Sequence, residues 1–222
     1  MNKFNFTEKN KYFNLLNNIL NYGKRQKQKK GEIVYLLNQV LSFNKTELNE
    51  LLNEHYKVPE KLLKSELELY MEGVNEVVKY KKQGIHWWDY CAPTMLNTYP
   101  TYFSKLPALI EKINNEKRPS KNYVLFIGET GVKTSQLPCL SLMQFQLTED
   151  GLNLTVYQRS ADSNLGLPCD LFQAYEIMKM INAPFNNLTF FIGNAHIYEN
   201  NIKNTIDLIT EKVKRPKFNL NV

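Results

Sequence analysis

The sequence has little cysteine and no long apolar run. Only three of its 222 residues are cysteines, namely Cys91, Cys139 and Cys169, and no two of them form a CxxC pair. This excludes a disulfide framework and gives a zinc site no support, so we expect three thiols, either packed as small apolar groups or kept for reactivity. No apolar stretch reaches membrane-spanning length, and the first residues lack the apolar core of a signal peptide. We therefore expect a cytoplasmic protein without a metal and without membrane contact.

The composition indicates an ordinary globular chain with a basic balance. Hydrophobic residues make up 43% of the sequence, and a length of 222 residues fits one domain, which we expect to span residues 1–222. The formal net charge is +6, and part of it lies in GKRQKQKKG at residues 23–31. A solvated loop is the favoured interpretation of this run, with a phosphate clamp or a nucleic-acid patch as alternatives. Because no aromatic residues are interleaved with the basic ones, the run gives nucleic acid little support as a partner.

Hydrophobic periodicity predicts helices and strands that alternate without βαβ regularity. The predicted helices cover residues 8–22 with Thr7 as cap, 45–56, 60–84 with Gly73 as a weak point, 104–117 with Ser104 as cap, a segment opened by Pro168, and 197–213. The predicted strands are 122–128 and 188–193, with a hairpin between them that turns at Glu149-Asp150-Gly151. We therefore expect an α+β fold with a mixed β-sheet packed with helices.

Chemically active residues gather at one end of the predicted hairpin. Cys139 starts its first strand, and Arg159 and Ser160 end its second, so antiparallel pairing should bring them together. A guanidinium close to a thiol lowers the thiol pKa and favours a nucleophile. Arg159 and Ser160 could equally hold an anion, and a buried core cysteine is the common alternative for Cys139. These residues alone indicate a nucleophile beside an anion site.

Several short motifs resemble the thymidylate synthase family in their order and approximate spacing. They are LPC before a strand, QRSAD, LGLPCD and GNAHIY. Upstream, SELELYMEGVNE resembles the family's helix with a catalytic glutamate, WWD resembles its Trp-Asp site, and LNTYP falls where the family has an active-site tyrosine. The resemblance covers residues 13–205. It implies a thymidylate synthase-like fold in which one face of the sheet forms a homodimer interface.

The resemblance also implies roles in the chemistry. Cys139 would attack C6 of a pyrimidine ring, and Glu66 would order the water network that moves protons to and from that ring. Trp88 and Asp89 would line the folate pocket, and Asp162 would lie on its folate and pyrimidine side. The implied co-substrate is 5,10-methylenetetrahydrofolate.

A pyrimidine nucleoside monophosphate would be the second substrate. Arg159 and Ser160 would bind its phosphate with Gln158 in support, and Lys29 would lie on the family's mobile phosphate-binding segment. Gly166 would lie beside the pyrimidine, and His196 and Tyr198 would contact the sugar. Lys121, with Arg118 as a further candidate, would reach the phosphate from the partner subunit.

The most informative departure from the family pattern is Asp170. The family's base-reading asparagine ends the motif LGLP-x-N, and this chain has an aspartate there. A carboxylate can accept from the N4 amino group of cytosine, whereas O4 of uracil offers only lone pairs. Asp170 resembles the cytidylate hydroxymethylase branch of the family in this respect. The alternative is an acid that merely favours the first turn of a helix.

Further departures concern the product and the phosphate. The chain ends at KRPKFNLNV, where thymidylate synthases continue into a tail that closes over the folate, so we expect water to reach the reaction intermediate. Cys91 replaces a second family tryptophan and is expected to open the pocket further. Leu140 replaces a polar residue after the nucleophile, and the loop at KKGE is shortened, which affects phosphate affinity and rate.

These features predict a deoxycytidylate 5-hydroxymethyltransferase that converts dCMP to 5-hydroxymethyl-dCMP through a covalent adduct between Cys139 and C6. One alternative is a methylating synthase that acts on dUMP, dCMP or CMP. Another is a non-catalytic relative that binds a nucleotide or nucleic acid. Cys139, Arg159, Glu66 and Asp170 are all present, which argues against a relative without activity.

Overall fold

The computed structural model describes residues 10–29, 31–131 and 137–212, and it confirms the α+β class. One mixed sheet has the strand order β1-β2-β7-β5-β4-β3, with the short β6 paired to β7. The strands are β1 (Lys24–Gln28), β2 (Gly31–Phe43), β3 (Ser120–Phe126), β4 (Leu140–Thr148), β5 (Gly151–Gln158), β6 (Ala161–Asp162) and β7 (Phe185–Tyr198). β7 is parallel to β5 and β6, and the other pairs are antiparallel.

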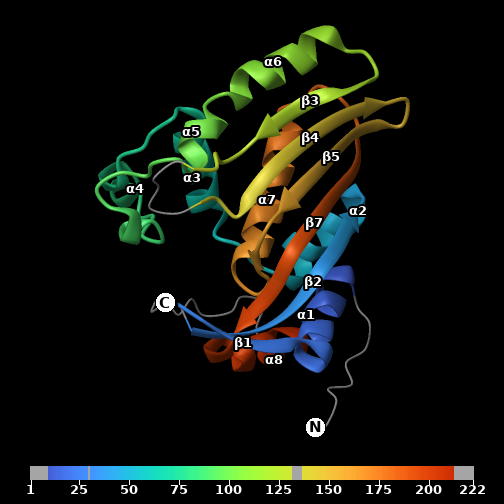
Figure 1. Cartoon of the computed structure of the whole chain (residues 1–222). Coiled ribbons are helices and arrows are strands. Elements are labelled where there is room, and N and C mark those ends of the chain that lie inside the picture. The colour runs from blue at the N-terminus through green and yellow to red at the C-terminus, as the bar shows by residue number, and fades with distance from the viewer. Residues whose placement is uncertain (1–9, 30, 132–136, 213–222) are drawn as a thin grey trace.

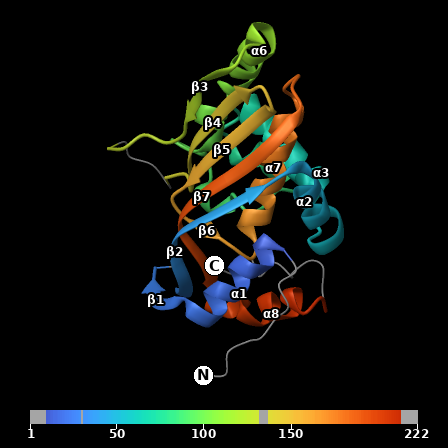
Figure 2. The ribbon, with the colours of Figure 1, turned by 90° about the vertical axis from the view of Figure 1, so that its right-hand side faces the viewer.

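The helices lie mainly on one side of this sheet, as Figures 1 and 2 show for α2, α3 and α7. Their bounds are α1 (Lys11–Tyr22), α2 (Lys45–Glu50) continued by a π-helical turn (Leu51–His55), α3 (Glu60–Met71), α4 (Val77–Lys82), α5 (Tyr99–Phe103), α6 (Leu106–Glu116), α7 (Gly166–Lys179) and α8 (Ile202–Ile209), with 3-10 turns at Asp89–Cys91 and Glu199–Asn201. In the described part of the chain, no helix combines the length and the apolar character needed to cross a bilayer.

Three predicted elements were wrong in kind or extent. Residues 24–28 of the basic run form the edge strand β1, because their backbone pairs with β2 while their side chains stay in solvent, as edge strands tolerate. The helix predicted over 60–84 is divided into α3 and α4, with Gly73 between them at φ +72°. Strand β7 continues to Tyr198 because β2 and β6 both pair with its second half, so the last helix begins only at Ile202.

Two predicted helix caps also need comment. α1 begins at Lys11, and Asn10 caps it by accepting from the N–H of Phe13 at 2.8 Å. The predicted cap Thr7 lies outside the described residues. Ser104 does not cap α6, which begins at Leu106; its hydroxyl donates to the carbonyl of Thr101 instead.

The core forms where α7 crosses the sheet (Figure 1). Alternate residues of the central strands are buried there, among them Phe145 of β4, Val156 of β5 and Phe190 of β7. Leu171 and Ile177 of α7 belong to the same apolar cluster. Since strand side chains alternate between faces, the register of these strands decides which residues meet α7 and which point away.

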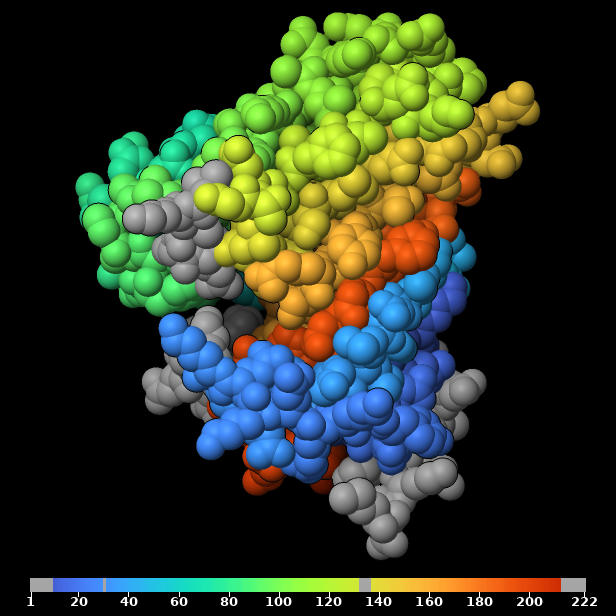
Figure 3. Space-filling model, viewed as in Figure 1, coloured from blue at the N-terminus to red at the C-terminus, as the bar shows by residue number. Residues whose placement is uncertain are grey.

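The residues that point away form an apolar row across five strands. In register, Val40 of β2 lies beside Phe191 of β7, then Tyr157 of β5, Leu142 of β4 and Phe126 of β3. Exposure reaches 69% for Phe126 and is still 44% for Phe191. Figure 3 views this side of the molecule, where the strands form the surface. A row of this kind is unusual on a water-facing sheet surface.

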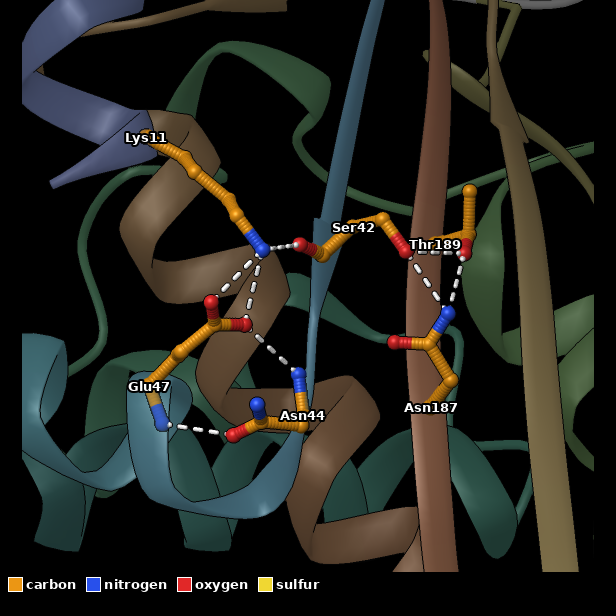
Figure 4. Close-up of polar contacts among 6 residues, drawn as sticks. All are labelled: Lys11, Ser42, Asn44, Glu47, Asn187 and Thr189. Carbon is orange, nitrogen blue, oxygen red and sulfur yellow. Dashed lines mark hydrogen bonds and ion pairs between the residues drawn. The ribbon is translucent and has the colours of Figure 1, made fainter.

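A polar cluster joins α1 and α2 to strands β2 and β7 (Figure 4). Its members are Lys11, Ser42, Asn44, Glu47, Asn187 and Thr189. Lys11 donates to the Ser42 carbonyl at 2.9 Å and to Glu47 at 2.8 Å, while Asn44 and Glu47 form a reciprocal capping box at the start of α2. On the other side, the Ser42 hydroxyl bonds Thr189 at 2.9 Å and accepts from Asn187 at 2.7 Å. The cluster thereby fixes β2 against β7.

Two glycines of the hairpins give a matched test of packing. Gly31 and Gly151 have nearly the same φ, +124° and +122°, but a Cβ at Gly31 meets open space, whereas one at Gly151 collides with the carbonyl oxygen of Pro184. That carbonyl accepts from the N–H of Leu152 at 2.7 Å and therefore cannot easily move. Gly31→Ala should lower the free energy of unfolding by about 1–3 kcal/mol because of backbone strain alone. Gly151→Ala should lower the free energy of unfolding by about 1–3 kcal/mol more, because the new Cβ collides with the Pro184 carbonyl. Urea unfolding of both variants measures the difference, and equal losses would contradict the contact.

Candidate active site

A cavity of about 350 Å³ opens between α3, α5, α7 and the ends of β4 and β5. Its lining combines an apolar wall with a few polar groups. The polar or ionisable lining residues are Glu66, Tyr70, Trp87, Trp88, Tyr90, Tyr99, Cys139, Gln158, Ser160, Asp162, Cys169, Asp170 and Gln173, and Gly166 lies among them. A concave, largely apolar site with a small number of convergent polar groups is typical of small-molecule binding.

Cys139 reaches this cavity because the hairpin pairs as predicted. The N–H of Arg159 donates to the carbonyl of Cys139 at 2.8 Å, which places the end of β5 beside the cysteine. The Arg159 guanidinium folds back and donates from Nε to the Pro138 carbonyl at 2.9 Å and from Nη2 to the Leu137 carbonyl at 2.7 Å. Arg159 thus holds the segment that carries Cys139. Its side chain is exposed outside the cavity, whereas Ser160 lines it.

Glu66 projects from α3 into the cavity wall, where four donors surround its carboxyl. Trp87 Nε1 at 2.5 Å, Trp88 Nε1 at 2.6 Å and the Tyr70 hydroxyl at 2.7 Å all donate to Oε1, and Gln173 Nε2 donates to Oε2 at 2.7 Å. Burial raises the pKa of Glu66, and these hydrogen bonds oppose that rise. The carboxyl is therefore fixed in place and poised to exchange a proton.

Asp170 faces the same cavity from α7. The first turn of α7 contains no acidic residue, so Asp170 is not the helix-dipole acid of the alternative interpretation. Gln158 at the end of β5 donates from Nε2 to Asp170 Oδ2 at 2.5 Å. Burial raises the pKa of Asp170 to about 7, with smaller contributions from the carboxyls of Glu66 and Asp162, while the Gln158 bond lowers it. Near neutral pH this carboxyl can therefore be either charged or neutral.

The sequence predicted that Gln158 supports the phosphate ligands, but the hydrogen bond of its side chain leads to Asp170. Its amide contacts Asp170 rather than Arg159 or Ser160. The reason is the alternation of β5, because Gln158 points to the α7 side of the sheet while Arg159 points away from it. The Gln158 side chain therefore lies beside Asp170 and not beside Arg159 and Ser160.

Three carboxyls, Glu66, Asp162 and Asp170, share the cavity, and its described lining contains no Lys, Arg or His. Burial raises the pKa of each of them. For Asp162 this rise is opposed by His196, which lies directly across from it in the pairing of β6 and β7. Such a site favours ligands that present hydrogen-bond donors, since acceptors would face other acceptors.

His196 and Tyr198 stand next to this cavity on β7. Their rings meet edge to face with 5.2 Å between centroids, and His196 Nδ1 lies 3.2 Å from the side-chain oxygen of Asn194. Burial lowers the pKa of His196, which favours the neutral ring even though Asp162 acts in the opposite sense. Gly166 begins α7. Gly166 therefore lines the cavity, and His196 lies opposite Asp162, which lines it too.

Several predicted site residues do not line the cavity, namely Arg159, His196, Tyr198, Lys29, Lys121 and Asp89. Lys29 is exposed in the turn after β1, and Lys121 lines a separate open hollow with Arg118. The carboxylate of Asp89 is exposed and pairs with Lys81 at 3.3 Å. Cys91 is buried in the core and does not line the cavity, and the expectation that it opens the pocket stays a prediction.

Several lining residues were not predicted. Trp87, Tyr70 and Gln173 all donate to Glu66, and Tyr90 packs on Trp88 with 6.0 Å between ring centroids. A signal for two of them was present in the sequence. Tyr70 follows Glu66 by four residues on one helix face, and Gln173 follows Asp170 by three.

Comparison with known proteins agrees with this geometry. The sequence model of the thymidylate synthase family matches residues 10–222. The chain belongs to the thymidylate synthase family. A thymidylate synthase of Clostridium beijerinckii is 25% identical over 205 residues, covering 86% of this chain and 78% of that protein.

Shorter alignments reach higher identity with other thymidylate synthases. The Staphylococcus haemolyticus protein is 31% identical over 107 residues, which is 46% of this chain and 34% of that protein. The Mycoplasma genitalium protein is 42% identical over 76 residues, or 32% of this chain and 26% of that protein. Membership of the thymidylate synthase family supports one-carbon transfer from methylenetetrahydrofolate, with folate and a pyrimidine nucleotide as substrates.

Proposed function

We propose that this family member transfers a one-carbon unit from 5,10-methylenetetrahydrofolate to C5 of a cytidylate, dCMP, and releases 5-hydroxymethyl-dCMP. The observation that carries the proposal is the Asp170 carboxyl, which lines the same cavity as Cys139 and Glu66. The nucleotide base would lie between these three residues, with C6 at the thiol and its far edge at Asp170.

The nucleophile in this proposal is Cys139. Its sulfur would bond to C6, which increases the electron density at C5, where the new carbon is added. Arg159 supports the step by holding the two carbonyls that precede the cysteine. Glu66, with its four donors, would relay protons through water near the ring.

Base recognition would depend on the charge of Asp170. Gln158 occupies Oδ2, so Oδ1 is the oxygen left to meet the base. An ionised Oδ1 accepts from the N4 amino group of cytosine, but it meets O4 of uracil lone pair against lone pair. The other carboxyls of the cavity add to this preference for a base that donates.

The remaining residues take the places that the family resemblance suggests. Arg159 and Ser160 would bind the phosphate, with Lys29 closing on it, and His196 and Tyr198 would contact the sugar. Asp162 and Gly166 would lie between the base and the folate. Trp88 would form the folate wall, with Asp89 behind it. No metal takes part in this proposal.

The hydroxymethyl product is proposed from the identity of Asp170, because an aspartate at this place in the motif resembles the cytidylate hydroxymethylase branch of the family. The second candidate is methylation of dUMP. It is favoured by a separate observation, because the aligned relatives are thymidylate synthases by name. The two candidates differ in both base and product and can be separated by assay.

We also propose that two copies associate through the open face of the sheet. The supporting observation is the apolar row of Val40, Phe191, Tyr157, Leu142 and Phe126, which runs in register across five strands. A second copy presents the same apolar row and would cover this surface by twofold symmetry. Lys121 on β3 would then be a candidate to reach the partner's phosphate.

Replacing Asp170 tests the base assignment. Asp170→Asn puts an amide N–H in place of a lone pair, so the ratio of kcat/KM for dCMP to that for dUMP should fall about ten- to a hundredfold at pH 8. At pH 6 the effect should be smaller, because the pKa of Asp170 is raised to about 7 and the wild-type carboxyl is then largely neutral. Asp150→Asn, in the exposed hairpin turn, is the control. An unchanged ratio at pH 8 would remove the main support for a cytidylate substrate.

The association can be tested on the same sheet face. Phe191→Lys places a charge in the centre of the apolar row and should shift the sedimenting species from the mass of two chains to that of one. Val78→Lys is the matched control, because Val78 is also an exposed apolar residue, at 56%, but lies on α4. If the wild-type protein sediments with the mass of one chain at micromolar concentration, the proposed dimer is wrong.

A further inference from the structure

The side chain of Gln158 is placed unusually for a residue of a binding site. It ends β5 with 1% exposure, yet it lines the cavity beside Asp170. Its Nε2 donates to Asp170 Oδ2, while its Oε1 is buried and has no hydrogen-bond partner among the described residues. Leaving a buried acceptor unpaired is costly. The amide orientation is therefore determined by Asp170 and by no other hydrogen bond of that side chain.

This arrangement links the orientation of the amide to the charge of the acid. An ionised carboxylate accepts only, so the amide must present Nε2 to it. In the observed orientation, with Nε2 toward Oδ2, the bond favours the ionised form of Asp170.

We propose that Gln158 is a positioning residue for base selection: by holding Oδ2, it favours the ionised form of Asp170 and leaves one oxygen, an acceptor, to meet the amino group of cytosine. Without this bond the carboxyl takes up a proton more easily, and a protonated oxygen can donate to O4 of uracil. Gln158 thereby decides at which pH the site distinguishes the two bases. This inference rests on the proposed function, since it assumes that Asp170 meets the base.

The other groups around Asp170 act in the opposite direction. Glu66 from α3 and Asp162 from β6 both raise the pKa of Asp170, as does burial by the cavity wall. Tyr99 from α5 and Cys139 before β4 also face this part of the cavity, and neither is a cation. Among the described residues that influence Asp170, the Gln158 amide is the one that favours its charged form.

The test compares Gln158→Leu with wild type over pH 5.5–9, with the ratio of kcat/KM for dCMP to that for dUMP as readout. The midpoint at which the cytosine preference develops should move up by about one pH unit or more, because a hydrogen bond to a charged group commonly changes an equilibrium by tenfold or more. At pH 7 the ionised fraction of Asp170 should fall from about one half to about one tenth, so dCMP use should fall about fivefold and dUMP use should change little. Calorimetric titration with dCMP alone over the same pH range should show the same shift in binding.

Two further variants complete the design. Gln146→Leu makes the same change at an exposed position of β4 and should leave the midpoint where it is. If Gln158→Leu does not fold, Gln158→Glu replaces it; a second carboxyl in that place should also move the midpoint upward. An equal loss for both nucleotides with an unmoved midpoint would show a merely structural role and overturn the inference. A different result would contradict the proposed function, namely an unchanged base preference in Asp170→Asn.

Discussion

The pairing of β5 on both of its edges is the constraint on which the site depends. β4 and β7 flank β5 and fix its last residue, Gln158, against Leu140 on one side and Ile192 on the other. The next N–H, that of Arg159, bonds the carbonyl of Cys139. A slip of one residue would exchange the faces, so that Arg159 would enter the cavity and Gln158 would leave it. The positions of the thiol, the amide and the anion-binding side chains are thus consequences of one strand register.

The cavity built on this register is electrostatically unusual because its described lining contains three carboxyls and no Lys, Arg or His. Each buried carboxyl is costly to charge, and its neighbours of the same sign increase that cost. Four neutral hydrogen-bond donors offset the cost of charging the Glu66 carboxyl, and the amide of Gln158 offsets that cost for Asp170. Neutral donors stabilise a carboxylate less than a guanidinium would, and the pKa of Asp170, raised to about 7, lets this group exchange a proton near neutral pH. This property suits a reaction that must move protons on and off a pyrimidine ring.

The parts that sequence alone predicted well are those with a strong local signal. The hairpin at Asp150-Gly151 and the segment opened near Pro168 were found because turn chemistry and period are local properties. The strand at 24–28 was missed because an edge strand in solvent shows no apolar alternation. The donor Trp87 was missed because it meets Glu66 only through the tertiary packing of two separate segments. The bond between Gln158 and Asp170 likewise joins a strand end to a helix, and no spacing rule predicts it.

The most direct test of the account offers the wild-type protein both nucleotides at once. Equal amounts of dCMP and dUMP are incubated with 5,10-methylenetetrahydrofolate at pH 8, the products are weighed by mass spectrometry, and dihydrofolate is followed by its absorbance. The expected result is 5-hydroxymethyl-dCMP formed in preference to any uracil product and without dihydrofolate, since water rather than a hydride completes the reaction. Thymidylate formed together with an equal amount of dihydrofolate, and no modified cytidylate, would contradict the account.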